Sequence, residues 1–444
     1  MWLEKIKRFP LVSFFYKIPG LAQLYHFILA FFGAIIYGFP SRNIFVIGVT
    51  GTKGKTTTLE LINAILEEAG KKTALLSSLR IKIDKKSEKN IFENTMPGRF
   101  FIQRFLNKAV KVGCKYALIE VTSQGVALSR HRFVNWKIGV ITNLAPEHIE
   151  AHGSFEKYRE AKLRFLQYVI KGGGKVFINK EDAPSSFFIK NLPQDKIVFY
   201  NTVEELVLET KRASGVFLGR FNQENVSAAV AVAKELGIKK KTVKTALKNF
   251  KGVPGRFEFV QTTPFSVVID YAHTPDSLEA VYKTLRGLKP KIKHLKPRLI
   301  CVLGSAGGGR DKWKRPEMGK IASEYCNEII LTNEDPYDED PSQILLEIKS
   351  GISNFPTRLA PARLRVAEGK SGRSQREAGR QFPISNFHEI LDRREAIKKA
   401  ISLAKDGDIV VLTGKGSESW IHIAKGGKIP WGERGIVEEV LKKE

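Results

Sequence analysis

The sequence predicts an α/β protein of two domains: a central nucleotide-binding domain of the P-loop ATPase type with a parallel sheet, and a C-terminal Rossmann-like domain. Three observations support this prediction. The chain has 444 residues, more than one ordinary domain. Short apolar runs alternate with segments of helical periodicity. The segment GVPGR at 252–256 interrupts both patterns. We therefore predict an N-terminal segment at 1–42, a central domain at 43–251 and a C-terminal domain at 252–444.

The N-terminal segment combines basic residues with an apolar run at 27–39. This run is shorter than the roughly 20 residues that a membrane-spanning helix needs. A basic start before an apolar run also resembles a signal peptide, but no small-residue cleavage site follows. We expect a helix that packs on the central domain or contacts a membrane surface peripherally through residues 20–40, in a cytoplasmic protein.

The central domain begins with the features of a phosphate-binding loop. Residues 43–47 read as a buried strand, residues 48–57 have the sequence GVTGTKGKTT, and a helical pattern then runs to Gly70. Val49 occupies the position of the first glycine of the strict motif, so the loop is a variant. Lys55 is expected on the β- and γ-phosphates, and the Thr56 hydroxyl on Mg²⁺. The other residues expected to bind ATP here are Gly51, Thr52, Gly54 and Thr57. A glycine-rich turn that binds nothing is the alternative, which the flanking strand and helix disfavour.

The rest of the chain continues the alternation. Further strands are predicted at residues 115–121, 137–142, 175–178, 266–270, 299–303, 328–332 and 408–413, and a helix at 155–169. Residues 357–382 contain seven basic and two acidic residues without periodicity, which predicts a disordered insert.

The charge and the cysteine content of the chain argue against several classes of function. The net charge of +27 is compatible with nucleic-acid binding, but we attribute it to anionic ligands and solvated surfaces, and expect no nucleic-acid partner. The three cysteines are far apart and form no C-x-x-C pair. This spacing suits a reducing cytosol and argues against both a disulfide framework and a zinc site.

A series of motifs then identifies a family. The motifs, in order, are ALIEVTS at 117–123, TNLAPEHIEAHG at 142–153, YREAK at 158–162, VPGRFE at 253–258, IDYAHTPD at 269–276, GRDKWKRP at 309–316, LDRREAI at 391–397 and GKGSE at 414–418. Together with the phosphate loop they resemble the Mur ligase family, ATP-dependent amide-forming enzymes of peptidoglycan synthesis, and most closely its members that add the third residue. The resemblance covers about residues 43–444, except for the insert.

The resemblance implies a role for each matching residue. Glu120 would join Thr56 on one Mg²⁺, and His148 would bind a second Mg²⁺ near Lys162, which the family carbamylates with CO₂. Asn225 would contact the adenine, and Arg256 and Asp270 would hold the nucleotide from the C-terminal domain. Lys55, His148 and Lys162 would be the catalytic residues. The substrate-binding residues would be Thr95, Pro97, Arg310, Glu334, Asp335, Tyr337, Gly414 and Glu418.

The resemblance implies amide formation as the reaction, and we expect the protein to be a monomer. ATP phosphorylates the carboxylate of a UDP-N-acetylmuramyl-dipeptide-type acceptor, and a diamino acid attacks the acyl phosphate, releasing ADP and phosphate. Two alternatives remain: a related ligase for another acid, of the folylpolyglutamate or cyanophycin type, and a non-enzymatic ATP-binding scaffold docked on membranes.

The chain also departs from the family pattern. Only about 42 residues precede the loop, where the family has a uridine-nucleotide-binding domain, although NTMP at 94–97 is similar to its substrate-contacting turn. Lys53 replaces an asparagine of the loop motif. The amino-acid motif D-N-P-R is EDPY at 334–337, which lacks the arginine that pairs with the distal carboxylate of meso-diaminopimelate. We therefore predict L-lysine or a similar basic diamino acid, unless Arg393 or Arg394 replaces the missing arginine.

Overall fold

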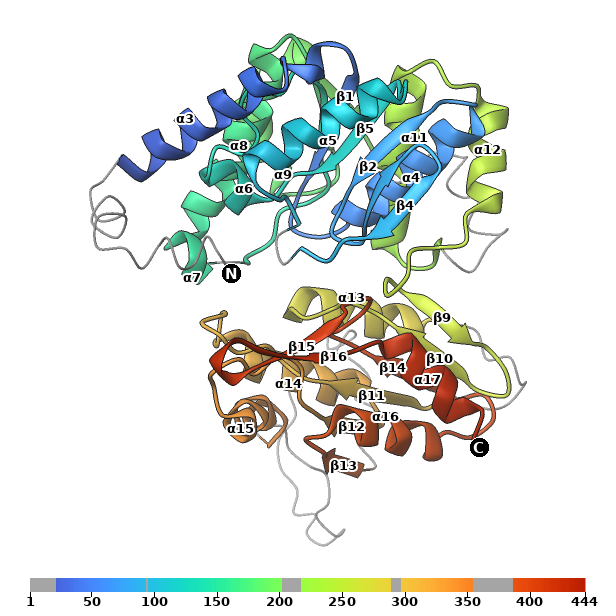
Figure 1. The fold of residues 1–444 in the computed structure, drawn as a ribbon. Coiled ribbons are helices and arrows are strands. Elements are labelled where there is room, and N and C mark those ends of the chain that lie inside the picture. Colours follow the sequence, from blue (N-terminus) through green and yellow to red (C-terminus); the bar gives the residue numbers. More distant parts are fainter. Residues whose placement is uncertain are drawn as a thin grey trace, which may run out of the picture. The chain divides into compact units, whose positions relative to one another are not determined.

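The computed structural model describes residues 21–92, 95–147, 149–201, 217–288, 297–353 and 386–443. The chain divides into two compact units, Met1–Lys251 and Gly252–Glu444. Each unit contains its own mostly parallel sheet with helices, so the predicted α/β fold is confirmed (Figure 1). The predicted insert at 357–382 lies outside the described residues.

The first unit is built on an eight-stranded sheet in the order β4-β3-β2-β5-β1-β6-β7-β8. Strands β2, β5, β1, β6, β7 and β8 are parallel, and β3 and β4 are antiparallel additions at one edge. The strands are β1 (Phe45–Thr50), β2 (Thr73–Leu76), β3 (Arg80–Ile83), β4 (Lys86–Lys89), β5 (Tyr116–Glu120), β6 (Trp136–Ile141), β7 (Lys175–Asn179) and β8 (Ile197–Tyr200). The helices are α3 (Leu21–Ile36), α4 (Lys55–Glu68), α5 (Arg99–Lys111), α6 (Ser123–Ala127), α7 (Ile149–His152), α8 (Phe155–Lys171), α9 (Ser185–Lys190), α11 (Arg220–Glu235) and α12 (Lys240–Asn249). Because β1 lies in the middle, the loop that follows it is flanked by the ends of β5 and β6.

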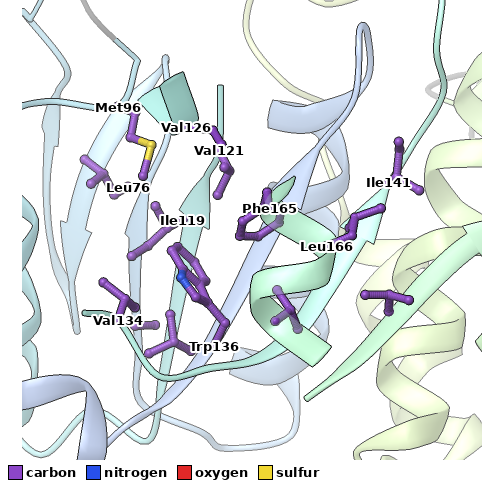
Figure 2. Packing of buried hydrophobic residues seen from close by; sticks show 14 of the residues in the cluster. Leu76, Met96, Ile119, Val121, Val126, Val134, Trp136, Ile141, Phe165 and Leu166 are labelled. Atoms are coloured by element: carbon purple, nitrogen blue, oxygen red, sulfur yellow. The ribbon is translucent and has the colours of Figure 1, made fainter. Parts of the chain in front are cut away.

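Two hydrophobic cores cover the two faces of this sheet. One core joins the sheet to α4, α11 and α12, and the other joins it to α5 and α8. In the second core, the rings of Trp136 and Phe165 meet edge to face with centroids 5.2 Å apart (Figure 2). A Cβ on Gly48 would lie 2.6 Å from the Phe165 ring, so the glycine of β1 allows this close packing.

Helix α3 lies against α5 and begins before the apolar run that suggested it. Its buried face includes Ala30, Ala34 and His26, and the Phe27 ring contacts that of Phe133 at 5.1 Å. In the part of the chain that the structure describes, no helix is long and apolar enough to cross a membrane.

The second unit contains a six-stranded sheet in the order β13-β12-β11-β14-β10-β9, parallel except for β9. A separate hairpin is formed by β15 and β16. The strands are β9 (Glu258–Gln261), β10 (Ser266–Ile269), β11 (Leu299–Leu303), β12 (Glu328–Leu331), β13 (Asn386–Glu389), β14 (Ile409–Leu412), β15 (Trp420–Ile423) and β16 (Gly427–Pro430). The helices are α13 (Pro275–Arg286), α14 (Lys314–Tyr325), α15 (Pro341–Ser353), α16 (Arg393–Ser402) and α17 (Glu433–Leu441).

The expectation that the cysteines stay unpaired is wrong for two of them. Cys301 and Cys326 form a disulfide with their Cα atoms 6.0 Å apart, whereas Cys114 is free and buried. Cys301 lies in β11, and Cys326 follows α14 and stands two positions before Glu328, the first residue of β12, which pairs with β11. The two residues are 25 positions apart in the sequence. The β-α-β crossover brings them close together, because β12 lies parallel to and beside β11.

Candidate active site

The loop between β1 and α4 has the predicted strand–loop–helix arrangement. Gly51 and Gly54 adopt positive φ angles of 142° and 79°. A Cβ on Gly51 would lie 1.9 Å from Thr142 Oγ1, and one on Gly54 would lie 2.1 Å from Asn225 Oδ1. Both positions therefore require glycine, because a side chain would collide with buried neighbours. The start of α4 points its backbone N–H groups toward this loop, as an anion-binding site requires.

Lys55 lies folded over the loop. Its Nζ donates hydrogen bonds to the carbonyl oxygens of Gly51 (3.1 Å) and Thr52 (2.9 Å). Lys53, the replacement for the family's asparagine, forms an ion pair of 2.8 Å with the buried Glu147. The loop therefore carries two lysines, one of which ties it to the segment after β6.

Thr56 and Glu120 meet at the start of α4. The Thr56 hydroxyl donates to Glu120 Oε2 at 3.0 Å, and the same oxygen accepts from Ser78 N at 2.9 Å. Glu120 ends β5, and its register partner on β1 is Val49, near the end of the strand that leads into the loop. A hydroxyl and a carboxylate at this distance are oxygen donors of the kind that Mg²⁺ prefers. Groups of three or more His, Cys, Asp or Glu side chains fit for a metal do not occur among the described residues, so phosphate and water would supply the other ligands.

Lys162 is a buried lysine at the loop, although 111 positions separate it from Gly51. Its Nζ donates to the Gly51 carbonyl oxygen at 2.8 Å and lies 4.4 Å from the centroid of the Tyr158 ring. Burial lowers the pKa of Lys162 well below its ordinary value, and the charge of Lys55 lowers it further. The side chain is thus held as a neutral amine more readily than an exposed lysine. Its predicted metal-binding partner, His148, lies outside the described residues.

Asn225 lies on α11, beneath the loop. Its Oδ1 accepts a hydrogen bond of 3.3 Å from Thr58 Oγ1 and contacts Gly54. The structure thus brings Asn225 to the phosphate loop, while its role toward adenine stays a prediction. Of the predicted substrate turn, Pro97 is buried and Thr95 is half-buried, and Met96 between them belongs to the hydrophobic core.

The second unit contains the other predicted residues. Asp270 orders the backbone, since its carboxylate accepts hydrogen bonds from Phe257 N and Ala272 N, both at 2.7 Å. The Arg256 guanidinium lies 3.9 Å from the centroid of the Tyr271 ring. Both residues hold their positions through local contacts that sequence spacing does not reveal.

A cluster of charged side chains surrounds the predicted amino-acid motif. Lys415 Nζ donates to Asp335 Oδ1 (2.8 Å) and to Glu418 Oε2 (2.5 Å), and the Tyr271 hydroxyl donates to Glu418 Oε1 (2.9 Å). Gly414 has a φ of 101°, and a Cβ there would lie 2.4 Å from Glu334 Oε2. Lys415 and Tyr271 are not among the site residues predicted from the sequence. Both lie within motifs that the sequence analysis quotes, GKGSE and DYAHTPD, and this position could have identified them.

Comparisons with known proteins cover both units. The sequence matches the Mur ligase middle domain over residues 49–233 and the Mur ligase glutamate ligase domain over residues 255–416. It is 33% identical over 440 residues to the UDP-N-acetylmuramoyl-L-alanyl-D-glutamate–2,6-diaminopimelate ligase of Syntrophomonas wolfei, covering 93% of this chain and 81% of that protein.

Comparison with solved structures also finds Mur ligases and proteins of the same fold. A UDP-N-acetylmuramoyl-L-alanyl-D-glutamate–2,6-diaminopimelate ligase structure is similar with a TM-score of 0.53 and 29% identity, covering 90% of this chain and 78% of the other. Folylpolyglutamate synthase of Mycobacterium tuberculosis has a TM-score of 0.64 at 16% identity, covering 87% of this chain and 92% of the other. At that identity the second match shows a shared fold alone.

Proposed function

The chain belongs to the Mur ligase family of ATP-dependent, carbon–nitrogen bond-forming ligases, and from this we infer that it extends a peptidoglycan precursor by one amino acid. The acceptor is a UDP-N-acetylmuramyl-dipeptide-type carboxylate, and the added residue is a diamino acid. The relatives named above act on this class of acceptor, according to their names. We place the reaction in the cytoplasm and assign it to a monomer.

The observation that carries this proposal is the buried Lys162 against the phosphate loop. A loop that only bound ATP would need Lys55 and Thr56 but no second, desolvated amine on Gly51. A neutral lysine amine reacts with CO₂ to form a carbamate, whose oxygens bind metal ions. We propose that Lys162 is carbamylated in this way, as the family resemblance implies.

We propose that two Mg²⁺ ions bind here. Thr56 and Glu120 would hold one, and His148 with carbamylated Lys162 the second. Bound there, the ions would offset the negative charge that accumulates when a carboxylate approaches a triphosphate.

The chain's own residues supply the remaining chemistry. Lys55 and the amides of the loop hold the triphosphate in position for in-line attack by the acceptor carboxylate. The products of this step are ADP and an acyl phosphate. The amine of the incoming amino acid then attacks the acyl carbon, phosphate leaves, and the amine loses a proton as the amide forms. Asn225, Arg256 and Asp270 are proposed to bind the nucleotide.

The proposed substrate contacts follow the resemblance. Thr95 and Pro97 would contact the acceptor. Arg310, Glu334, Asp335, Tyr337, Gly414 and Glu418 would contact the amino acid.

Trapping the acyl phosphate tests the proposal directly. With ATP, Mg²⁺ and UDP-N-acetylmuramyl-dipeptide, hydroxylamine should yield an acyl hydroxamate and one ADP per product, because it intercepts the activated carboxylate without any amino acid. Mass spectrometry identifies the product. A hydroxamate formed instead from a folate or a cyanophycin peptide would support the alternative ligases. ATP binding without a hydroxamate from any acid would support the scaffold.

We also propose that α3 attaches the protein peripherally to an anionic membrane surface. Its exposed apolar side chains, taken at 100° per residue, lie within an arc of about 180° on one side of the helix. They are Leu24, Tyr25, Phe27, Ile28, Phe31, Phe32, Ile35 and Ile36. The described helix contains no charged residue, and the chain as a whole carries a net charge of +27, which favours anionic lipid.

Vesicle sedimentation checks this second proposal. The protein should bind vesicles that contain anionic lipid and be released by high salt or mild detergent. The double variant Phe32→Asp, Ile35→Asp should lose at least about tenfold in affinity, because each substitution places a carboxylate on the apolar side. Leu346→Asp, at an exposed apolar residue of the second unit, is the matched control. Equal binding by the double variant and the control would contradict the proposal, and resistance to both salt and detergent would indicate a spanning segment.

A further inference from the structure

Glu334 is a buried carboxylate that lacks a partner for one of its oxygens. Its side chain is 4% exposed, and Oε2 has no hydrogen-bond donor among the described residues. Burial raises the pKa of Glu334, and the neighbouring Asp335 raises it further. Lys415, Arg393 and Lys314 lower that pKa in part, but none of them donates a hydrogen bond to Oε2, so this oxygen is available to a ligand cation.

The nearby cations of the protein are bonded to other groups. Lys415 is shared between Asp335 and Glu418. Lys314 Nζ donates to the carbonyl oxygen of His273 at 3.0 Å. The second acid of the motif, Asp335, is thus already neutralised by Lys415 and also accepts from His422 N at 2.8 Å. Of the two acids that suggested a distal ammonium in the sequence, only Glu334 remains for a ligand.

The arginines that could have received a distal carboxylate are also paired. Arg393 is completely buried in an ion pair with Glu433, and its Nη2 also donates to the Thr413 carbonyl oxygen at 2.7 Å. Arg394 pairs with Glu439 at 2.7 Å. Neither Arg393 nor Arg394 therefore replaces the arginine of the family motif, whose position Tyr337 occupies in this chain.

Tyr337 itself forms an aromatic surface beside the charged cluster. Its ring stacks on that of His422, with centroids 4.9 Å apart and planes 14° apart. Arg310 Nη2 lies 3.5 Å from the Tyr337 hydroxyl, so one guanidinium is present, sufficient for a single carboxylate. The Arg310 guanidinium also lies 5.9 Å from the centroid of the Tyr337 ring, so protein groups already cover this ring. The cluster thus offers one cation for a carboxylate and one unpaired carboxylate for a cation.

We propose that the second unit selects an amino acid whose side chain ends in an ammonium group and carries no second carboxylate, as in L-lysine or L-ornithine. The α-carboxylate pairs with Arg310, and the distal ammonium pairs with Glu334. A distal carboxylate, as in meso-diaminopimelate, would lie beside Glu334 and Glu418 without a free guanidinium. This inference rests on the proposed function, and it departs from the substrate in the names of the relatives.

Competition between amino acids tests the inference. With equal concentrations of L-lysine and meso-diaminopimelate in one ligation reaction, the lysine product should exceed the other by at least about tenfold, measured by mass spectrometry. Preferential incorporation of meso-diaminopimelate would overturn the inference.

Three variants test the roles of Tyr337 and Glu334. Tyr337→Arg supplies the missing guanidinium and should shift the preference toward meso-diaminopimelate by at least about tenfold, whereas Tyr337→Phe keeps an aromatic ring and should leave it unchanged. Glu334→Gln removes the carboxylate charge but keeps the size, and should raise the KM for L-lysine by about tenfold or more with a smaller change in kcat. Unchanged KM in Glu334→Gln and unchanged preference in Tyr337→Arg would contradict the proposal.

Hydroxamate formation distinguishes this inference from the proposed function. The wild-type protein should form the hydroxamate, because hydroxylamine takes the place of the amino acid and does not use the ammonium-binding residues. A hydroxamate together with a preference for meso-diaminopimelate would refute only the amino-acid inference. Without a hydroxamate the proposed function fails, and equilibrium dialysis with radiolabelled L-lysine and meso-diaminopimelate still decides the preference of the cluster.

Discussion

Replacing Lys162 with alanine is expected to lower the rate of amide formation by about 10³-fold, or about 4 kcal/mol of transition-state stabilisation. Lys162 is buried at the Gly51 carbonyl, where its lowered pKa favours the neutral amine that CO₂ requires. Without it, the proposed second Mg²⁺ loses its carbamate ligand. Phosphate release in the presence of acceptor and amino acid measures the loss.

The carbamate makes this prediction specific. A short-chain carboxylate such as acetate should partly restore the Lys162→Ala variant, because it supplies the missing oxygens. Removal of dissolved CO₂ should slow the wild-type protein and leave the variant unchanged. Lys171→Ala, at the exposed end of the same helix, is the matched control and should behave like the wild type. Near-normal turnover of Lys162→Ala would refute the second-metal hypothesis.

Lys55→Ala should abolish measurable ATP hydrolysis, with a loss of about 10³-fold or more in kcat/KM. In the structure, Lys55 Nζ donates to the carbonyl oxygens of Gly51 and Thr52, which holds the ammonium within the loop. We expect it to exchange these carbonyls for phosphate oxygens when the nucleotide binds. Its removal leaves the developing charge on the transferred phosphoryl group without its nearest cation.

Direct measurements separate binding from chemistry for this variant. ATP affinity from calorimetry should fall, and hydroxamate formation should be lost, whereas thermal unfolding should stay close to that of the wild type. Lys71→Ala, at an exposed lysine after α4, is the matched control. Hydroxamate formation by Lys55→Ala at the wild-type rate would show that the loop does not hold the reacting triphosphate.

Local patterns in the sequence were sufficient for the elements and for the phosphate loop. The apolar run before Gly48 and the helical spacing after Lys55 predicted β1 and α4, because side-chain periodicity is a property of neighbouring residues. The family motifs placed Thr56 and Glu120 together, and the structure joins them by a hydrogen bond of 3.0 Å.

Burial, pairing and long-range contact were decided only by the tertiary structure. The sheet order brings Lys162 to Gly51 and lowers its pKa, and the crossover through α14 joins Cys301 to Cys326 against the expectation from spacing. The tertiary structure also decides the pairing within the amino-acid motif EDPY, whose two acids, Glu334 and Asp335, look equivalent in the sequence. Folding neutralises Asp335 with Lys415 and leaves Glu334 Oε2 without a donor, because the partner of a charge depends on which strands are adjacent and not on distance along the chain.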